Sequence, residues 1–171
     1  MTPGLRRFAS RCAPLLAALL LAASGAPAGE GETTLSPGDR VAPFSAEALD
    51  GSRREVIYPK GSATVLVFFL SSCPTCHRMI PEWNRAYERR APGVNVIGVL
   101  LDREPPGFFT VTPVAFPVVR SPGREFLKSY GVQHVPVTLR IRAGGVVDEV
   151  GQGPLDPIRL GAFFRAAAPA R

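Results

Sequence analysis

Two cysteines separated by two residues are the part of this sequence that is best suited to chemistry. Cys73 and Cys76 enclose Pro74 and Thr75, and this spacing lets the two sulfur atoms reach each other. If a helix begins at the first cysteine, its unpaired N–H groups and partial positive charge favour a thiolate over a thiol. We therefore expect Cys73 to be the exposed attacking thiolate and Cys76, one turn further on, to be the buried resolving thiol. The motif predicts thiol–disulfide exchange, with these two residues as the catalytic pair.

The elements on either side of the motif should position it. The continuous β-branched and aromatic run at 64–70 predicts a strand buried on both faces, directly before the cysteines. A helix is expected from near Cys73 to about Arg90, before the stop at residues 91–93. Residues 94–101 form a second apolar run. Strand, helix and strand in this order predict a right-handed crossover between parallel strands.

The remaining segments predict further short elements of the same α/β domain. We expect an edge strand at 41–45, a turn at 50–51, a loop-rich insertion at 102–115 and a short strand at 116–119. A helix at 121–130, a β-hairpin at 137–150 and a final helix at 157–168 should follow. The large apolar side chains of the buried strand and first helix, including Phe68, Phe69 and Trp83, are expected to lie in the core.

The N-terminal residues have the composition of a secretory signal peptide rather than of the domain. Three arginines precede an apolar run at 15–23, and Ala26-Pro27-Ala28 fits the small-residue cleavage rule. The run is about half of the ~20 residues that a membrane-spanning helix needs, although an uncleaved segment would act as an anchor. We therefore expect a signal peptide at 1–28, a flexible lead-in at 29–40 and the domain at 41–171. The protein should be exported, for example to the periplasm.

Composition supports one packed domain and argues against nucleic-acid binding. The chain has 171 residues, of which 46% are hydrophobic and 20% charged, so wholesale disorder is excluded. Its net charge of +6 falls to +3 without the three arginines of residues 1–28, which removes the main support for a nucleic-acid partner. Cys12 would leave with the signal peptide. Two remaining cysteines in an exported chain indicate redox or metal chemistry.

The cysteine motif also occurs in metal and haem sites. A zinc site needs two further ligands, and His77 and His134 are the only histidines. His77 also completes Cys-x-x-Cys-His, the attachment signal for c-type haem, which is the main competing interpretation. The flanking strands and the shortage of a distal ligand count against haem, since Met79 is too close to His77. A peroxiredoxin would carry Thr or Ser at Leu70. We expect neither metal nor cofactor.

A proline directly before the expected strand at residue 137 is a second feature that bears on the function of the cysteine motif. Pro136 follows Val135 about sixty residues beyond the cysteines, where it cannot donate to a strand ladder. Together with the motif and with Pro81 in the expected helix, it resembles the thioredoxin-like family over about residues 36–167. That resemblance implies a central mixed β-sheet flanked by helices. It also implies a cis Val135–Pro136 bond facing the cysteines, with the Val135 backbone free to bind an extended partner chain.

Within that family the chain looks most like the exported TlpA/DsbE-type thiol–disulfide oxidoreductases, because Pro74-Thr75 lies between the cysteines and a signal peptide precedes them. The resemblance implies a reductase whose partners are protein thiols and disulfides, apocytochrome c among them, with a membrane electron donor. A non-enzymatic assembly factor of the same fold is the other alternative. The chain has Val67 and Met79 where relatives carry acids. His134, two residues before Pro136, is therefore expected either to handle protons or to shape the partner groove.

Overall fold

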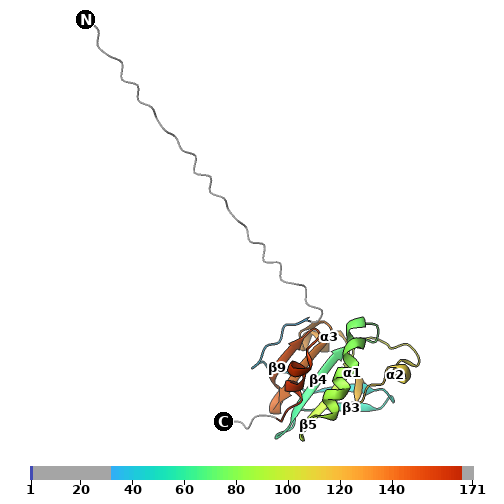
Figure 1. Ribbon diagram of the computed structural model, residues 1–171. Coiled ribbons are helices and arrows are strands. Elements are labelled where there is room, and N and C mark those ends of the chain that lie inside the picture. The colour runs from blue at the N-terminus through green and yellow to red at the C-terminus, as the bar shows by residue number, and fades with distance from the viewer. Residues whose placement is uncertain (2–31, 167–171) are drawn as a thin grey trace.

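The computed structural model describes Met1 and residues 32–166 (Figure 1). Apart from Met1, the expected signal peptide at 1–28 lies outside the described residues. The strands are β1 (Glu32–Thr33), β2 (Phe44–Ala48), β3 (Arg53–Val56), β4 (Ala63–Phe69), β5 (Val94–Leu100), β6 (Val118–Arg120), β7 (Val132–His134), β8 (Val137–Arg142) and β9 (Val146–Gln152). The α-helices are α1 (Pro74–Glu88), α2 (Phe108–Val111), α3 (Arg124–Ser129) and α4 (Pro157–Phe163).

The larger sheet of the described chain is mixed and has β4 near its centre. Its strand order is β3-β2-β6-β5-β4-β8-β9, and β1 pairs separately with β7. Strand β4 runs parallel to β5 and antiparallel to β8, and all seven of its residues are buried. This confirms the expected strand buried on both faces, the parallel pair and the α/β fold with a central mixed sheet.

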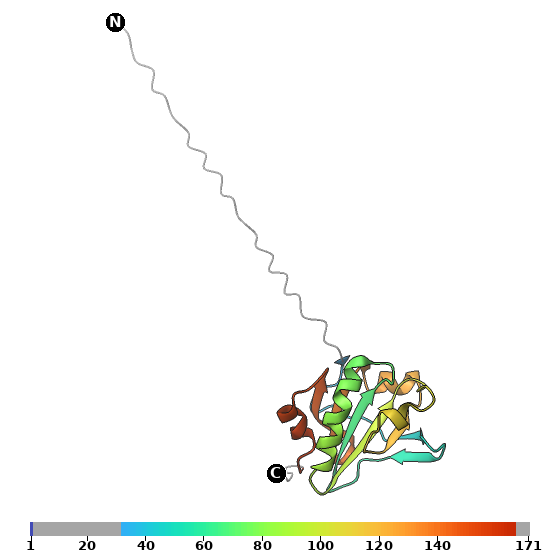
Figure 2. The ribbon, with the colours of Figure 1, turned by 45° about the vertical axis from the view of Figure 1, so that its right-hand side comes forward.

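Helices cover both faces of the sheet. Val65, Val67 and Phe69 of β4 lie in one core cluster with side chains of α1 and α4. Leu66 and Phe68 alternate with them and belong to a second cluster that includes Phe126 of α3 and the following Tyr130. Helices α1 and α4 lie beside each other in front of the strands in Figure 2. The expected burial of Phe68, Phe69 and Trp83 is confirmed.

Several elements differ from the expected segments. Short strand β3 and short strand β7 were not predicted, the 102–115 insertion contains α2, and α4 ends at Phe163. The lead-in expected to be flexible contributes β1, whose Thr33 is buried and donates from Oγ1 to the carbonyl of Tyr130 at 2.9 Å. Gln152 donates from Nε2 to the carbonyl of Thr33 at 3.0 Å. These partners are about a hundred residues away along the chain, so a local sequence pattern carries no sign of them.

The chain around Gly131 holds this N-terminal strand against the domain. Gly131 has φ +59°, and its carbonyl accepts from the Thr34 amide at 3.0 Å. A Cβ atom there would collide with Thr34 Oγ1. The position therefore needs glycine both for its backbone angle and for the close approach of the N-terminal segment.

We predict that Gly131→Ala destabilises the protein by at least about 2 kcal/mol, because strain in the left-handed region adds to the collision. The matched control is Gly61→Ala, since Gly61 has φ +77° but no atom within 4 Å of a Cβ. That variant should lose only about 1 kcal/mol. Urea unfolding of both variants measures the difference, and equal losses would contradict the role given to the Thr34 contact.

Candidate active site

Cys73 lies at the junction of β4 and α1. Strand β4 ends at Phe69, a short turn follows, and Cys73 is the N-cap residue of α1 with φ −86° and ψ 113°. Its sulfur accepts a hydrogen bond from the Cys76 amide at 3.2 Å. Its side chain is partly buried, and neither cysteine is in a disulfide. The geometry places a partly accessible sulfur among the unpaired N–H groups of a helix N-terminus, where negative charge is stabilised.

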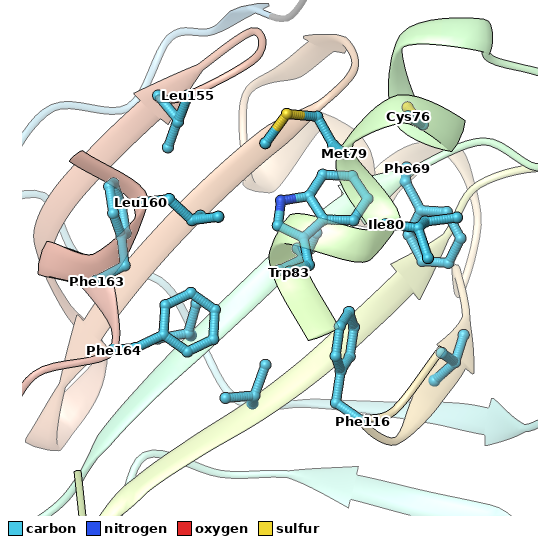
Figure 3. Close-up of a cluster of buried hydrophobic side chains, with 14 of the residues drawn as sticks. Phe69, Cys76, Met79, Ile80, Trp83, Phe116, Leu155, Leu160, Phe163 and Phe164 are labelled. Carbon is cyan, nitrogen blue, oxygen red and sulfur yellow. The ribbon is translucent and has the colours of Figure 1, made fainter. Parts of the chain in front are cut away.

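Cys76 lies one turn further along α1 and is fully buried. It belongs to the core cluster beneath the helix, and Figure 3 shows it on α1 with Met79 and Trp83 further along. Burial, together with the hydrogen bond and charge interaction with Cys73, raises the pKa of the Cys76 thiol well above its ordinary value. Val67 and Met79, where relatives carry acids, are both buried. The second thiol is therefore held protonated in apolar surroundings.

A cavity separates Cys73 from the segment before β8. The Val135–Pro136 peptide bond is cis, as the resemblance implied. The cavity has a volume of about 330 Å³ and brings Cys73 together with Val135 and His134. Pro136 itself is buried, and its carbonyl accepts from the Gly153 amide at 2.9 Å. The remaining lining residues, which the sequence did not single out as site residues, are Leu70, Pro74, Thr75, Leu101 and Gln133.

His134 lies on the rim of this cavity and forms an ion pair with the N-terminal strand. Its Nδ1 is 3.6 Å from a carboxylate oxygen of Glu32, and the two side chains are 66% and 53% exposed. The two residues are register partners in the β1–β7 pair. An exposed pair of this kind contributes little to stability. It does, however, place an acid and a histidine beside the opening.

The turn before Cys73 is held from two sides. Asp102, just beyond β5, accepts from the Ser71 amide at 2.8 Å and from its hydroxyl at 2.9 Å. The same carboxylate accepts from the Ser72 amide at 3.1 Å and from its hydroxyl at 3.0 Å. On the other side, His77 donates from Nε2 to the Ser71 carbonyl at 2.6 Å. His77 is exposed, as expected, but it is bonded to the turn, and its ring lies tilted against that of Phe108 with 5.5 Å between the ring centroids.

The carboxylate of Asp102 remains ionised despite its partial burial. Burial opposes ionisation, but the hydrogen bonds from Ser71 and Ser72 outweigh it and lower the pKa of Asp102. The sequence placed Asp102 only at the start of the loop-rich insertion at 102–115. The signal that could have revealed it is position, because parallel strands β4 and β5 end at the same edge of the sheet. A residue just past one strand then lies beside the residues just past the other.

The described residues contain no group of three or more His, Cys, Asp or Glu side chains arranged to hold a metal ion. Among these same residues, no helix has both the length and the apolar composition that crossing a membrane requires.

A helix N-cap cysteine, a buried cysteine one turn later and a cis-proline directly after Val135, which lines the cavity beside Cys73, define a thiol–disulfide oxidoreductase of the thioredoxin-like class. The chain belongs to the Redoxin family, whose model matches residues 36–157. It is a TlpA/DsbE-type member of the thioredoxin-like fold.

Individual relatives agree with this assignment. The chain is 27% identical over 137 residues to the thiol-disulfide oxidoreductase ResA of Halalkalibacterium halodurans, covering 77% of each chain. It is 26% identical to a structure described as the thiol:disulfide interchange protein DsbE of Chlorobium tepidum, with a TM-score of 0.63, covering 75% of this chain and 93% of that one. StoA of Bacillus subtilis has the same fold, with a TM-score of 0.62 at 22% identity, covering 71% and 96%.

We predict that His134→Ala weakens partner binding without changing the pH profile of exchange, because His134 lies on the exposed rim of the cavity. The expected rise in KM is about threefold to tenfold, the equivalent of one side-chain hydrogen bond. Steady-state exchange measured across a pH series separates KM from kcat. Glu32→Gln, which removes only the paired charge, is the control and should raise KM less. A displaced pH profile in His134→Ala would instead assign proton handling to this histidine.

Proposed function

We propose that this protein is an exported thiol–disulfide oxidoreductase that works as a reductase on protein disulfides. The observation that carries the proposal is the contrast between the two cysteines. Cys73 is partly accessible at a helix N-cap, whereas Cys76 is buried directly behind it, with its amide bonded to the Cys73 sulfur. One sulfur is therefore placed to meet a partner, and the other is placed to meet only Cys73.

In the first step, the Cys73 thiolate attacks one sulfur of a partner disulfide. A bond forms between Cys73 and that sulfur, the partner's S–S bond breaks, and the released partner thiolate takes a proton from solvent. The helix N-terminus supports the attacking thiolate, because its unpaired N–H groups and dipole stabilise negative charge. The product is a mixed disulfide between the two proteins.

In the second step, Cys76 loses its proton and attacks the Cys73 sulfur. The Cys73–Cys76 disulfide forms, the mixed disulfide breaks, and the departing partner sulfur receives a proton. Two electrons have then passed from the protein to its partner. The raised pKa of Cys76 keeps the buried thiol protonated in the resting dithiol, so that Cys73 is the sulfur that attacks first.

The cavity between Cys73 and the cis-proline is the proposed partner site. Val135 offers its backbone to an extended chain, Pro136 fixes that backbone, and His134 lies on the rim. Leu70, Leu101 and Pro74 make the cavity largely apolar, which suits an aliphatic side chain next to the partner's cysteine.

Export, the partner and the electron source complete the proposal. The signal-peptide pattern at 1–28 supports transport to the periplasm or a comparable compartment, followed by release or by anchoring through an uncleaved segment. Exported proteins with paired cysteines, apocytochrome c among them, are the proposed partners. A membrane electron donor would return the Cys73–Cys76 disulfide to the dithiol.

Haem attachment through Cys73, Cys76 and His77 is less well supported than exchange. Cys76 is fully buried, and His77 uses Nε2 to bond the Ser71 carbonyl. Both features favour a packed redox site over an exposed attachment site. A non-enzymatic assembly factor of the same fold would have no need for the accessible N-cap sulfur.

We predict that Cys73→Ser abolishes exchange and that Cys76→Ser accumulates a mixed disulfide with the partner, because the resolving sulfur is then missing. The activity is measured as reduction of insulin disulfides by the protein, with dithiothreitol as the reductant that regenerates the dithiol. Intact-mass spectrometry of the exported protein detects the trapped mixed disulfide. The matched control is Cys12→Ser, which should retain full activity. Full activity in Cys73→Ser, or a covalently bound haem in the measured mass, would contradict the proposal.

The direction of exchange gives a separate prediction. Equilibration with glutathione buffers should give a reduction potential on the reducing side of glutathione, below about −230 mV. The physical reason is that Cys76 stays protonated in its apolar surroundings, so no thiolate at this sulfur stabilises the reduced form in the way that would make the protein a strong oxidant. A potential near about −120 mV, typical of strong oxidants, would reverse the proposed direction while leaving the exchange chemistry intact.

A further inference from the structure

The turn that delivers Cys73 to helix α1 is bound by a carboxylate from another strand. All four donors on Asp102 belong to Ser71 and Ser72, the two residues directly before Cys73. Both backbone amides of the turn are included, so the path of the main chain into the N-cap is fixed relative to the end of β5. Cys73 also donates its own amide to the Leu70 carbonyl at 3.3 Å, which closes the turn on itself.

Asp102 also supplies a negative charge that acts on Cys76, although neither Val67 nor Met79 carries one. Val67 and Met79 are buried apolar side chains. The charge of Asp102 adds to burial and to the Cys73 contacts in raising the pKa of Cys76. Because the pKa of Asp102 is itself lowered, this charge persists at neutral pH.

We infer that Asp102 is a positioning residue of the exchange reaction, which holds the Ser71–Ser72 turn so that Cys73 stays at the helix N-terminus and keeps a negative charge beside the cysteine pair. This inference rests on the proposed exchange reaction and deepens it. At pH values where Cys76 begins to ionise, a charge that disfavours its thiolate also makes the dithiol a stronger reductant, because the disulfide gains relative stability.

Other charged groups around the pair have different partners. His77 bonds the Ser71 carbonyl, Arg78 donates to the Thr75 hydroxyl at 2.9 Å, and His134 pairs with Glu32. Beyond Asp102, Glu104 forms a bidentate pair with Arg120. The titratable and charged groups that face the cysteines or Asp102 are thus Glu32, Glu47, His77, Arg78, Arg103, Glu104, Arg120 and His134. Of all these carboxylates, Asp102 is the one that accepts hydrogen bonds from the Ser71–Ser72 turn.

The charge is tested with Asp102→Asn in the full-length protein. Carbon-13 NMR of labelled cysteine should show a lower pKa for Cys76 than in the wild type, since a repelling charge has been removed. At pH values that approach the pKa of Cys76, the equilibrium with glutathione should shift towards the dithiol, by up to about threefold for half a pKa unit, whereas at neutral pH it should stay unchanged because Cys76 is protonated in both proteins. An unchanged Cys76 titration in the folded variant would overturn the role assigned to the charge.

The matched control is Asp156→Asn. Asp156 caps α4 by accepting from the amides of Ile158 and Arg159, both at 2.9 Å, so the variant loses the same charge and a comparable set of bonds elsewhere. Its Cys76 titration and glutathione equilibrium should match the wild type. A shift of equal size in this control would show that loss of any carboxylate suffices, and it would overturn the inference.

Positioning is tested with the double variant Ser71→Ala, Ser72→Ala, which keeps the charge and both amide donors but removes two of the four bonds. The exchange rate should fall by at least about threefold while the Cys76 titration stays unchanged, because the attacking sulfur is less well placed. This variant carries the test even if Asp102→Asn does not fold. A wild-type rate would overturn the positioning role. Failure of the proposed function is separate, since it would appear as absent exchange in the wild-type protein.

Discussion

Complete burial of strand β4 is the constraint on which the rest of the molecule depends. Each of its seven residues is at most 1% exposed, and it is paired on both edges, with β5 and with β8. Its side chains alternate between the α1–α4 layer and the α3 layer, so both cores are built on the same strand. Burying each large side chain contributes about 1.5–3 kcal/mol, which fixes the end of β4 firmly. The turn and helix that carry the cysteines start from that fixed point.

The same core determines why two identical side chains behave differently. Helix α1 packs one face on the sheet, and Cys76 falls on that face with Met79, Ile80 and Trp83 (Figure 3). Cys73 precedes the helix and therefore lies at its N-terminal end, outside the buried face. The difference between the two sulfurs therefore follows from helical geometry and from one buried stripe. No acid has to be present beneath Cys76 to create it.

Much of this arrangement could be predicted from the sequence because its causes are local. The run at 64–70 is apolar throughout, the cysteines directly follow it, and Ala91-Pro92-Gly93 ends the helix close to the observed Glu88. The cis bond at Val135–Pro136 was implied by the family resemblance and is confirmed. Strand β3 pairs with neighbouring β2, but it consists mostly of exposed charged residues, so its sequence carries no apolar alternation. Strand β1 was missed because its partners, β7 and Gln152, lie far away along the chain. Asp102 was missed as a site residue for the same reason, since its four donors lie about thirty residues away.

Strand β1 has a consequence for how the molecule can be tethered. Glu32 lies opposite His134, so the chain enters the domain beside the cavity that contains Cys73. At the other terminus, the Phe164 carbonyl accepts from the Ala91 amide at 2.9 Å, just past the far end of α1. The fifteen residues of α1 separate these two points by about 20 Å. An attachment directly before residue 32 therefore lies at the end of the domain that carries the reactive sulfur, whereas an attachment directly after residue 166 lies at the opposite end of α1.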